Sequence, residues 1–504
     1  MQPVLTPEEM AAVDAAAPEP VDVLIGRAGA ATARVALRML RGCYGRRVVV
    51  VAGKGNNGND GRAAAERLAR RGVRVQVVAA AETGSGHLPP ADLVIDAAYG
   101  TGFHGEYHAP DPGGAPVLAV DIPSGVDGLT GQASGWPLAA QRTVTFAALK
   151  PGLLFHPGRG LAGEVTVADI GLDASGTRVG LVGTDDVAAW LPPRPVVAHK
   201  WQSAVLVVAG SPGMTGAAHL AASAAQRAGA GMVRVASPGV GADPGLPTEA
   251  VGVGDIDRPD WDLVVATTQL DRARALVVGP GLGLAESTVA AVRRLVEAAS
   301  QRPVLVDGDG LTALGDTAGD LLRGRAQPAV LTPHDGEFAR LASGPPGHDR
   351  IAATRDLARE LEAVVLLKGP TTVVAHPGGS ARVVIAGDQR LATAGTGDVL
   401  SGIIGALLAR GVDPFDAAAA GAWLHATASR SGPAEGLVAS DVVGGIPEAL
   451  AAARARRPPP PSLDDAPGSI ASARPRPGDV GCGDSRREPA AEPSGSAPDH
   501  GGRL

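Results

Sequence analysis

The stretch GKGNNGND, residues 53–60, lies between a valine-rich run and a run rich in alanine and arginine. A β-branched run, a glycine turn and a helical run in that order form the first half of a βαβ unit. The stretch also contains Asn56, Asn57 and Asn59, which are all the asparagines of the chain. We therefore expect an α/β fold here and a function that needs amide side chains in this turn.

The same alternation of β-branched and alanine-rich runs recurs in two blocks, which predicts α/β architecture with largely parallel sheets. The predicted strands are residues 46–53, 73–79, 92–98 and 116–123 in the first block, and 203–210, 275–281, 303–310, 329–336 and 363–370 in the second. At the start of the chain, Thr6, Pro7 and Glu9 have the spacing of a helix N-cap, first helical residue and capping box.

The two blocks predict two domains, residues 1–180 and residues 190–455, with a linker region near residues 171–200. From residue 456 to residue 504 the chain is rich in Pro, Gly, Ser, Asp and Arg and has almost no large apolar residue. Such a tail cannot bury enough apolar surface to offset its ordering entropy, so we expect it to be disordered.

Charge and cysteine content argue against several classes of protein. A formal net charge of −7 gives no basic footprint for nucleic acid. Cys43 and Cys482 are the only cysteines, too few for a disulfide framework. The sequence shows neither a signal-like leader nor a long uncharged apolar stretch. We expect a cytoplasmic protein with no nucleic-acid or membrane partner.

Lysine is scarce, and arginine takes most basic positions. The four lysines are Lys54, Lys150, Lys200 and Lys368. Because an ammonium is a compact point charge and a guanidinium is a planar fork, the remaining lysines are candidates for sites where only an ammonium fits.

The glycines Gly53, Gly55 and Gly58 also match the dinucleotide fingerprint G-x-G-x-x-G, so an ordinary NAD-binding domain is one interpretation. The carboxylate of Asp60 would repel a phosphate in such a turn, which counts against it. A structural interpretation also exists, because Asn and Asp tolerate left-handed turns and cap helices.

Polar residues follow two later strands of the first block. Asp96 and the loop Gly100–Gly102 follow one predicted strand, and Asp121 and Ser124 follow the next. Parallel sheets present ligands at the carboxyl ends of their strands. Asn57, Asp96 and Ser124 would then offer hard oxygen ligands with one negative charge, which suits a monovalent cation.

The motifs VAGKGNNGNDGR, VIDAAYGTG, DIPSGVDGLTG and TVTFAALKPGLLFHPGRGLAGEVTVADIGL together resemble the N-terminal epimerase domain of the NAD(P)H-hydrate repair enzymes, over most of residues 1–175. The resemblance implies a Rossmann-like three-layer αβα domain and potassium on Asn57, Asp96 and Ser124. It also implies contacts with the hydrated nucleotide from Asn56, Asn57, Gly58, Asn59, Asp60, Gly100, Thr101, Gly102, Phe103, His104, Gly105, Glu106 and Asp121. Two residues depart from the family pattern: Asn59 replaces a usual glycine and Gly26 a common acidic residue.

The second block is centred on ATAGTGDVLSGIIGALLARG, residues 392–411. Gly395, Thr396 and Gly397 predict a turn whose amides open onto a helix, which is an anion hole. Asp398 at the helix start can take a proton from a hydroxyl that attacks a phosphoryl group. The alternative is a glycine turn with Asp398 as the N-cap. Lys368, in LLKG, can reach a nucleotide phosphate.

With HKWQSAVLVVAG, LVVGPGLG, VLVDGDGL and LTPHDGEFARL, this block resembles the ribokinase-like, ADP- or ATP-dependent NAD(P)H-hydrate dehydratases across residues 185–450. Trp201 departs from the family, which usually has glycine after H-K. The resemblance implies that the hydrate meets Ala217, Gly283, His334 and Asp398. It implies that the adenine nucleotide meets Lys368, Gly369, Pro370, Thr371, Thr372 and Gly397.

Together the resemblances imply a bifunctional enzyme that repairs NADHX and NADPHX, the hydrates of NADH and NADPH. The first domain would interconvert the R and S epimers with K⁺, and Asp121 is our candidate for proton transfer. The second would dehydrate the S epimer with ADP or ATP and Mg²⁺, using Asp398 as base. We also expect a homo-oligomer. The alternatives are a ribokinase-like small-molecule kinase fused to a degenerate NAD-binding regulatory module, and a non-catalytic NAD-binding regulator.

Overall fold

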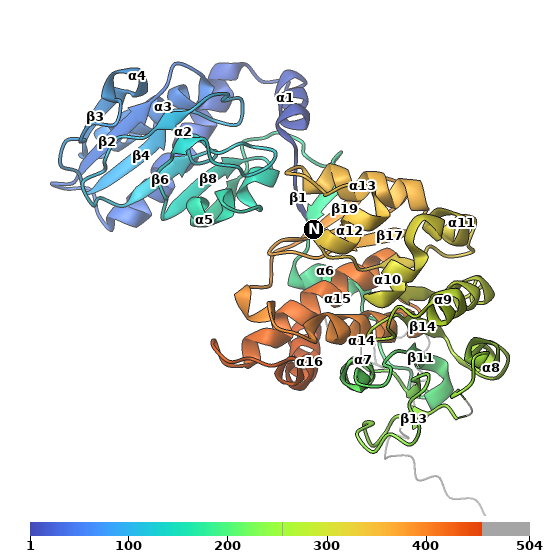
Figure 1. Cartoon of the computed structure of the whole chain (residues 1–504). Helices are drawn as coiled ribbons and strands as arrows, with labels where there is room; N and C mark the ends of the chain where they lie inside the picture. The colour runs from blue at the N-terminus through green and yellow to red at the C-terminus, as the bar shows by residue number, and fades with distance from the viewer. Residues whose placement is uncertain (255, 456–504) are drawn as a thin grey trace, which may run out of the picture. The chain divides into compact units, whose positions relative to one another are not determined.

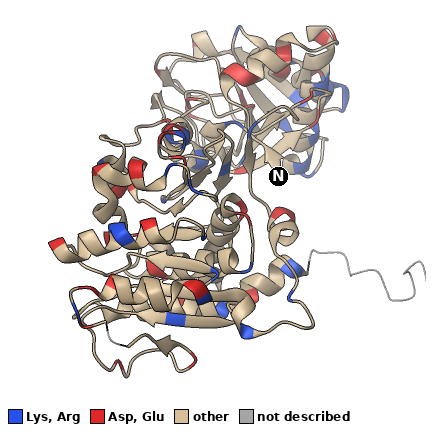
Figure 2. Ribbon diagram, turned by 90° about the vertical axis from the view of Figure 1, so that its right-hand side faces the viewer, with Lys and Arg blue, Asp and Glu red and all other residues tan. Residues whose placement is uncertain are grey.

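The computed structural model describes residues 1–254 and 256–455. The tail expected to be disordered, residues 456–504, lies outside these ranges. Within them, no helix combines the length and the apolar character needed to cross a membrane. Acidic and basic residues are scattered over the ribbon, and most of it carries neither (Figure 2).

The first sheet has six parallel strands in the order β3-β2-β4-β6-β8-β9. Its strands are β2 (Arg47–Ala52), β3 (Arg74–Ala79), β4 (Leu93–Ala97), β6 (Val117–Val120), β8 (Arg142–Phe146) and β9 (Glu164–Ala168). Val51 of β2 pairs with Asp96 of β4, which pairs with Ala119 of β6. This register aligns the carboxyl ends of three strands at one edge of the sheet.

Alternate residues of the first sheet belong to two hydrophobic cores. Val48 and Val50 pack with helices α2 and α3, whereas Val49 and Val51 pack on the opposite face with residues near α4 and Tyr107. Figure 1 shows α2 and α3 beside β2 and β4. The other elements of this part are α1 (Pro7–Ala15), α2 (Val21–Leu40), α3 (Asn56–Arg70), α4 (Ala80–Thr83), β5 (Tyr107–His108), β7 (Gly135–Trp136), η1 (Pro151–Leu153) and α5 (Gly158–Ala162).

The second sheet is mixed and has eleven strands, in the order β1-β10-β19-β18-β17-β16-β15-β14-β11-β12-β13. The seven neighbouring strands β17, β16, β15, β14, β11, β12 and β13 are all parallel to one another. Strands β17, β18 and β19 form an antiparallel meander. The strands are β1 (Gln2–Pro3), β10 (Val179–Leu181), β11 (Ala204–Val208), β12 (Met232–Ala236), β13 (Val251–Gly252), β14 (Ala275–Val278), β15 (Val304–Val306), β16 (Val330–Leu331), β17 (Val364–Leu367), β18 (Thr372–Ala375) and β19 (Ala381–Val384).

Helices cover both faces of the second sheet. Val205 and Val207 of β11 pack on one face, and Leu206 and Val208 pack on the other. The first face is covered by α6 (Thr184–Trp190), α7 (Thr215–Arg227), α14 (Thr396–Ala409), α15 (Pro414–Ala428) and α16 (Ala439–Arg454). The second is covered by α8 (Trp261–Thr268), α9 (Glu286–Ala298), α10 (Asp309–Leu314), α11 (Ala318–Leu322), α12 (Asp335–Leu341) and α13 (Arg350–Leu361). Short 3-10 turns are η2 (Lys200–Ser203), η3 (Leu270–Arg272), η4 (Gly315–Thr317), η5 (Gln389–Leu391) and η6 (Ser429–Ser431).

The structure confirms the α/β class and places a strand within every predicted strand range, each shorter than its range. It also confirms the capping box, in which Thr6 accepts from Glu9 and the Glu9 side chain accepts from the Thr6 amide. The prediction of a linker at 171–200 was incomplete. That stretch holds β10 and α6, and Val187 of α6 is buried in the second sheet's core. Trp201 lies in η2, which leads directly into β11.

The glycine turn after β2 gives a test of this packing. A Cβ added to Gly53 would lie 1.9 Å from the Ala98 carbonyl oxygen, whereas one added to Gly55 meets nothing within 4 Å. Gly53→Ala should therefore force the backbone apart and lower stability by about 1–3 kcal/mol, as overpacking does. Gly55→Ala is the matched control and should leave the thermal unfolding midpoint almost unchanged. Equal midpoints for the two variants would contradict the close approach of these strands.

Candidate active sites

The asparagines of the opening stretch lie in the first turn of α3. The helix begins at Asn56, its N-cap is Gly55, and no side chain caps it. The backbone does not take a positive φ at Asn56, Asn57 or Asn59. Helix capping and left-handed turn geometry therefore do not explain them, and the structural interpretation was wrong for this turn.

A cavity of about 1040 Å³ opens at the carboxyl end of the first sheet. Among the residues expected to contact substrate, its lining includes Asn56, Asn57, Asp60, Gly100, Thr101, Gly102, Phe103, His104 and Asp121. Gly58, Asn59, Gly105 and Glu106 are not part of that lining. Asn59 instead accepts a hydrogen bond from Arg62 at 3.3 Å. The structure thus brings nine of these residues together at one cavity.

A buried ion pair lies in the wall of this cavity. Lys150 is 1% exposed, and its Nζ lies 2.7 Å from Asp121 Oδ1. The ammonium also donates to Thr145 Oγ1 at 2.8 Å and to the Phe146 carbonyl at 3.0 Å. Asp121 has a φ of 67°, a left-handed conformation that is rare for a residue with a side chain. The strained backbone and the ammonium together fix the Asp121 carboxylate at the cavity.

Three further carboxyl groups line the same cavity, from Asp14 of α1, Asp60 of α3 and Glu82 of α4. Burial, followed by the charges of Asp121 and Asp14, raises the pKa of Asp60 to about 8, although Lys150 acts in the opposite direction. Burial also raises the pKa of Asp14. Four carboxyl groups thus line one cavity, and Asp60 holds its proton near neutral pH.

Of the residues expected to hold a cation, Asn57 lines the cavity, whereas Asp96 and Ser124 do not. Asp96 is fully buried, and its carboxylate accepts from the Ser124 amide at 2.9 Å and the Ser124 hydroxyl at 2.6 Å. Burial raises the pKa of Asp96. Among the described residues, neither the oxygen nor the nitrogen of the buried Asn57 side-chain amide has a hydrogen-bond partner. A free amide oxygen and a buried carboxylate fit a hard cation of low charge.

In the second block, the GTG turn opens α14. Gly395 is the N-cap, with a φ of 86°, and Asp398 is the third helical residue with no capping hydrogen bond. The alternative of Asp398 as an N-cap was therefore wrong. Burial, then the charge of Asp307, raises the pKa of Asp398 to about 6, while Lys368 lowers it. Such a carboxylate is ionised at neutral pH and basic enough to take a proton.

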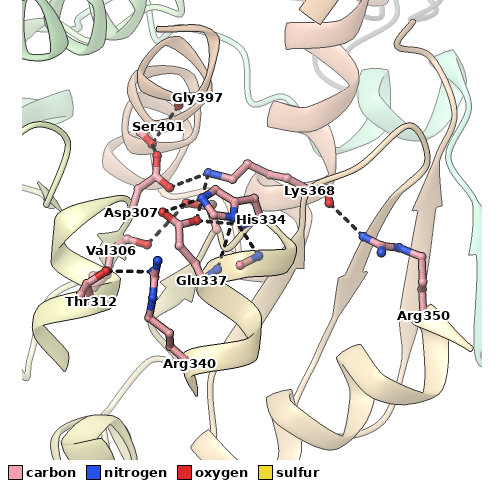
Figure 3. Close-up of polar contacts among 12 residues, drawn as sticks. Val306, Asp307, Thr312, His334, Glu337, Arg340, Arg350, Lys368, Gly397 and Ser401 are labelled. Carbon is pink, nitrogen blue, oxygen red and sulfur yellow. Dashed lines mark hydrogen bonds and ion pairs between the residues drawn. The ribbon is translucent and has the colours of Figure 1, made fainter. Parts of the chain in front are cut away.

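Lys368 lies at the centre of a buried polar cluster (Figure 3). Its Nζ is 2.8 Å from Asp307 Oδ1 and 3.7 Å from Glu337 Oε2. The Ser401 hydroxyl of α14 donates to Asp307 Oδ2 at 2.6 Å. Burial acts against the ammonium, but Asp307 and Glu337 outweigh it and raise the pKa of Lys368. A Cβ on Gly397 would lie 3.7 Å from Nζ, so the lysine faces the turn at the start of α14.

His334 has a structural role in the site. It is the N-cap of α12, where Nδ1 accepts from the amides of Gly336 and Glu337. Its side chain is 58% exposed, and Nε2 lies 3.6 Å from Glu337. This leaves the outer edge of the imidazole accessible to a ligand.

The remaining predicted residues lie on several other segments of the second block. Gly283 donates its amide to Asp309, and Ala217 lies beside Gly281. In the stretch Lys368–Thr372, the Thr371 side chain is buried and donates to the Leu154 carbonyl at 2.6 Å, so its hydroxyl is already satisfied. Thr372 begins β18. Gly369 and Pro370 form the turn between Lys368 and these two threonines.

Arg350 supports the turn at Gly369 from α13. Its guanidinium pairs with Asp335 at 2.7 Å and 2.9 Å. Figure 3 shows that it also donates to the Lys368 carbonyl, at 3.0 Å. A Cβ on Gly369 would lie 3.0 Å from the same guanidinium. This fork fixes the backbone that carries Lys368.

Sequence reasoning did not assign site roles to Asp14, Lys150, Asp307, Glu337 and Ser401. Lysine scarcity had marked Lys150 as a candidate, and its position in the motif ALKPG was visible. Asp307 follows a predicted strand in VLVDGDG, at the edge where parallel sheets bind ligands. Asp14, Glu337 and Ser401 carry no comparable signal, because only the tertiary fold brings them to these sites.

Comparison with known families matches both halves of the chain. The family described as NAD(P)H-hydrate dehydratase matches residues 205–443. The family described as YjeF-related protein N-terminus matches residues 21–88 and 80–152. The crystal structure of an ADP/ATP-dependent NAD(P)H-hydrate dehydratase from Bacillus subtilis, co-crystallised with ATP/Mg²⁺, is 31% identical, with a TM-score of 0.48 over 55% of this chain and 99% of that one.

Two curated relatives match most of the chain. The bifunctional NAD(P)H-hydrate repair enzyme Nnr of Mycobacterium tuberculosis is 42% identical over 407 residues, which cover 75% of this chain and 82% of the relative. The Nnr enzyme of Mycobacterium leprae is 40% identical over 472 residues, covering 86% and 95%. The chain therefore belongs to the family of bifunctional NAD(P)H-hydrate repair enzymes.

Proposed function

We propose that this chain carries out both reactions of NAD(P)H-hydrate repair, one at each site. Water added at C6 of the nicotinamide ring gives R and S hydrates that cannot transfer hydride. The first site interconverts the epimers, and the second converts the S hydrate to NADH or NADPH with ADP or ATP. The observation that carries the proposal is the geometry of the Asp121 carboxylate, fixed by Lys150 at the wall of a large cavity.

At the second site, Asp398 takes the proton of the 6-hydroxyl as that oxygen attacks the terminal phosphoryl group of the nucleotide. The amides of the turn at Gly395–Gly397 face the transferred group, and the Lys368 ammonium offsets its charge. Mg²⁺ on the nucleotide phosphates supplies further charge neutralisation. Loss of inorganic phosphate from C6 and of a proton from C5 then restores the ring.

At the first site, Asp121 transfers protons near C6, and a potassium ion would be held by Asn57, Asp96 and Ser124. The unpartnered amide of Asn57 and the buried Asp96 carboxylate support this ligand set. The homo-oligomer and the cytoplasmic location expected from the sequence stay predictions.

Asp398→Asn keeps the shape of the side chain and removes the base. We expect it to lower dehydration of pure S hydrate by about 10²–10⁴-fold, the usual contribution of such a base. The same protein should still equilibrate R with S, which chromatography detects without any gain of NADH absorbance. Asp121→Asn should do the reverse, converting S hydrate to NADH while R is left behind.

Loss of both activities from either substitution would show that the two sites are not independent. Asp398→Asn with the parent dehydration rate would rule out Asp398 as the base. A stable phosphorylated product in place of NADH would support the small-molecule kinase alternative.

The pH profile of the dehydratase should report Asp398. Because its pKa is raised to about 6 and the ionised form is the base, kcat/KM should fall as pH decreases through about 6. An ordinary exposed aspartate would give a fall near about pH 4. Initial rates of S-hydrate dehydration between these pH values distinguish the two cases.

Potassium should activate the epimerase reaction alone. Replacing K⁺ by Li⁺ should slow R-to-S conversion, because a smaller ion is poorly matched to this set of ligands. Asp96→Ala should remove both the ion dependence and most of the epimerisation, and leave dehydration of S hydrate unaffected. Equal epimerase rates of the parent enzyme in the two salts would contradict the ion site.

A further inference from the structure

We propose that Asp60 is a second proton-transfer group of the epimerase site, acting as an acid while Asp121 acts as the base, and that Lys150 is a positioning residue that fixes the Asp121 carboxylate. The inference rests on the proposed epimerase function. It goes beyond that function by assigning separate acid and base roles to two carboxyl groups in one cavity.

The base role follows from the contacts of Asp121. Its Oδ1 receives the Lys150 ammonium at 2.7 Å and the Thr145 hydroxyl at 3.1 Å. Lys150 is 1% exposed and has no other carboxylate in contact among the described residues. These two contacts hold the Asp121 carboxylate in one position at the cavity. Asp121 is therefore our candidate for the group that accepts a proton from water.

The acid role follows from the surroundings of Asp60. Its carboxyl group is 8% exposed, lines the cavity, and makes no ion pair within the described residues. The charged groups acting on it are Asp121, Asp14 and Lys150, of which two are carboxylates. The further charged residues of the cavity lining are Lys54, Arg62, Glu82 and His104. Burial and the neighbouring carboxylates favour a neutral Asp60, with a pKa of about 8.

The two roles give a balanced epimerisation. Asp60 donates its proton to the 6-hydroxyl, the C6–O bond breaks, water leaves, and the N1 electron pair forms a C6=N1 double bond. A water molecule then adds to the other face of C6, the electron pair returns to N1, and Asp121 takes the proton of that water. Transfer of this proton back to Asp60 through solvent resets the site. No redox partner is needed, and the ring gains and loses one water.

Asp60→Asn tests the acid role, since asparagine resembles a neutral aspartic acid in shape and polarity but has no proton to transfer. We expect R-to-S conversion to fall by about 10²–10⁴-fold, and dehydration of S hydrate to stay at the parent rate. The epimerase activity of the parent enzyme should also fall as pH rises through about 8, because Asp60 then loses the proton that it donates. Glu66→Gln, on an exposed position of the same helix α3, is the matched control and should behave as the parent.

Two readouts separate the acid role from a merely structural one. In oxygen-18-labelled water, each R-to-S conversion by the parent should place the label at C6, and retention of the original oxygen would rule out the step. The parent must keep the Asp60 carboxyl group neutral in the fold, so its stability should fall as pH rises from about 4 to 8. Asp60→Asn has no such group. The unfolding midpoint of Asp60→Asn should therefore rise relative to that of the parent over this pH range. A constant difference would show that Asp60 is not held in its neutral form.

Lys150→Met tests the positioning role. We expect kcat for epimerisation to fall with little change in KM, because the ammonium that fixes the Asp121 carboxylate is gone while the rest of the cavity is kept. Thr145→Val is nearly isosteric, removes the bridging hydroxyl, and should lower kcat in the same way by a smaller amount. Lys200→Met, at an exposed lysine, is the control.

The outcomes distinguish this inference from the proposed function. A parent enzyme that does not interconvert R and S would overturn the function. A parent that does so, with Asp60→Asn equally active, would overturn the acid role alone. An unchanged kcat for epimerisation in both Lys150→Met and Thr145→Val, or a loss that appears in KM instead of kcat, would overturn the positioning role.

Discussion

Both sites depend on a buried ammonium that neutralises buried carboxylates. Lys150 faces Asp121 in the first site and Lys368 faces Asp307 in the second, each at less than 3 Å. Removing a carboxylate from water costs several kcal/mol unless a partner charge is fixed beside it. In the first site Lys150 offsets the charge of the Asp121 carboxylate, and in the second site Lys368 offsets the charges of Asp307 and Glu337. The ion pairs thus allow several acidic groups to lie close together at the strand ends.

The parallel sheets decide where these charges meet. In the first sheet, the register of β2, β4 and β6 places the Asn57 turn, Asp96 and Asp121 at one edge. In the second, Asp307, His334 and Lys368 follow the neighbouring strands β15, β16 and β17. Ligands bind at the carboxyl ends of strands in open α/β sheets, and both sites follow that rule. The helices α3 and α14 begin at these edges, so their free amides face the same space.

Much of this arrangement is predictable from local sequence. Valine runs followed by glycine turns identified the strands. The strand-end residues Asp96 and Asp121, and Asp398 in the first turn of a helix, were recognised because chemistry at these positions needs specific side chains. The strand pairings were not predictable. Gln2–Pro3 pairs with Val179–Leu181, far along the chain. This pairing could not be predicted, because two-residue strands carry no periodicity. Asp14 likewise reaches the first cavity only through the packing of α1.

Within a composition that favours arginine, the retained lysines and asparagines become intelligible from their contacts. The Lys150 ammonium contacts Asp121, Thr145 and Phe146 in a space that is 1% exposed. A guanidinium is planar and larger, so it cannot direct its donors to three acceptors around one point in such a space. An asparagine amide supplies an oxygen without adding a charge, and the first cavity already holds four carboxyl groups. An aspartate in place of Asn57 would add a fifth and compete with Asp121 for the Lys150 ammonium. The rarity of lysine and asparagine in the chain and the electrostatics of the first site therefore point to the same two residues, Lys150 and Asn57.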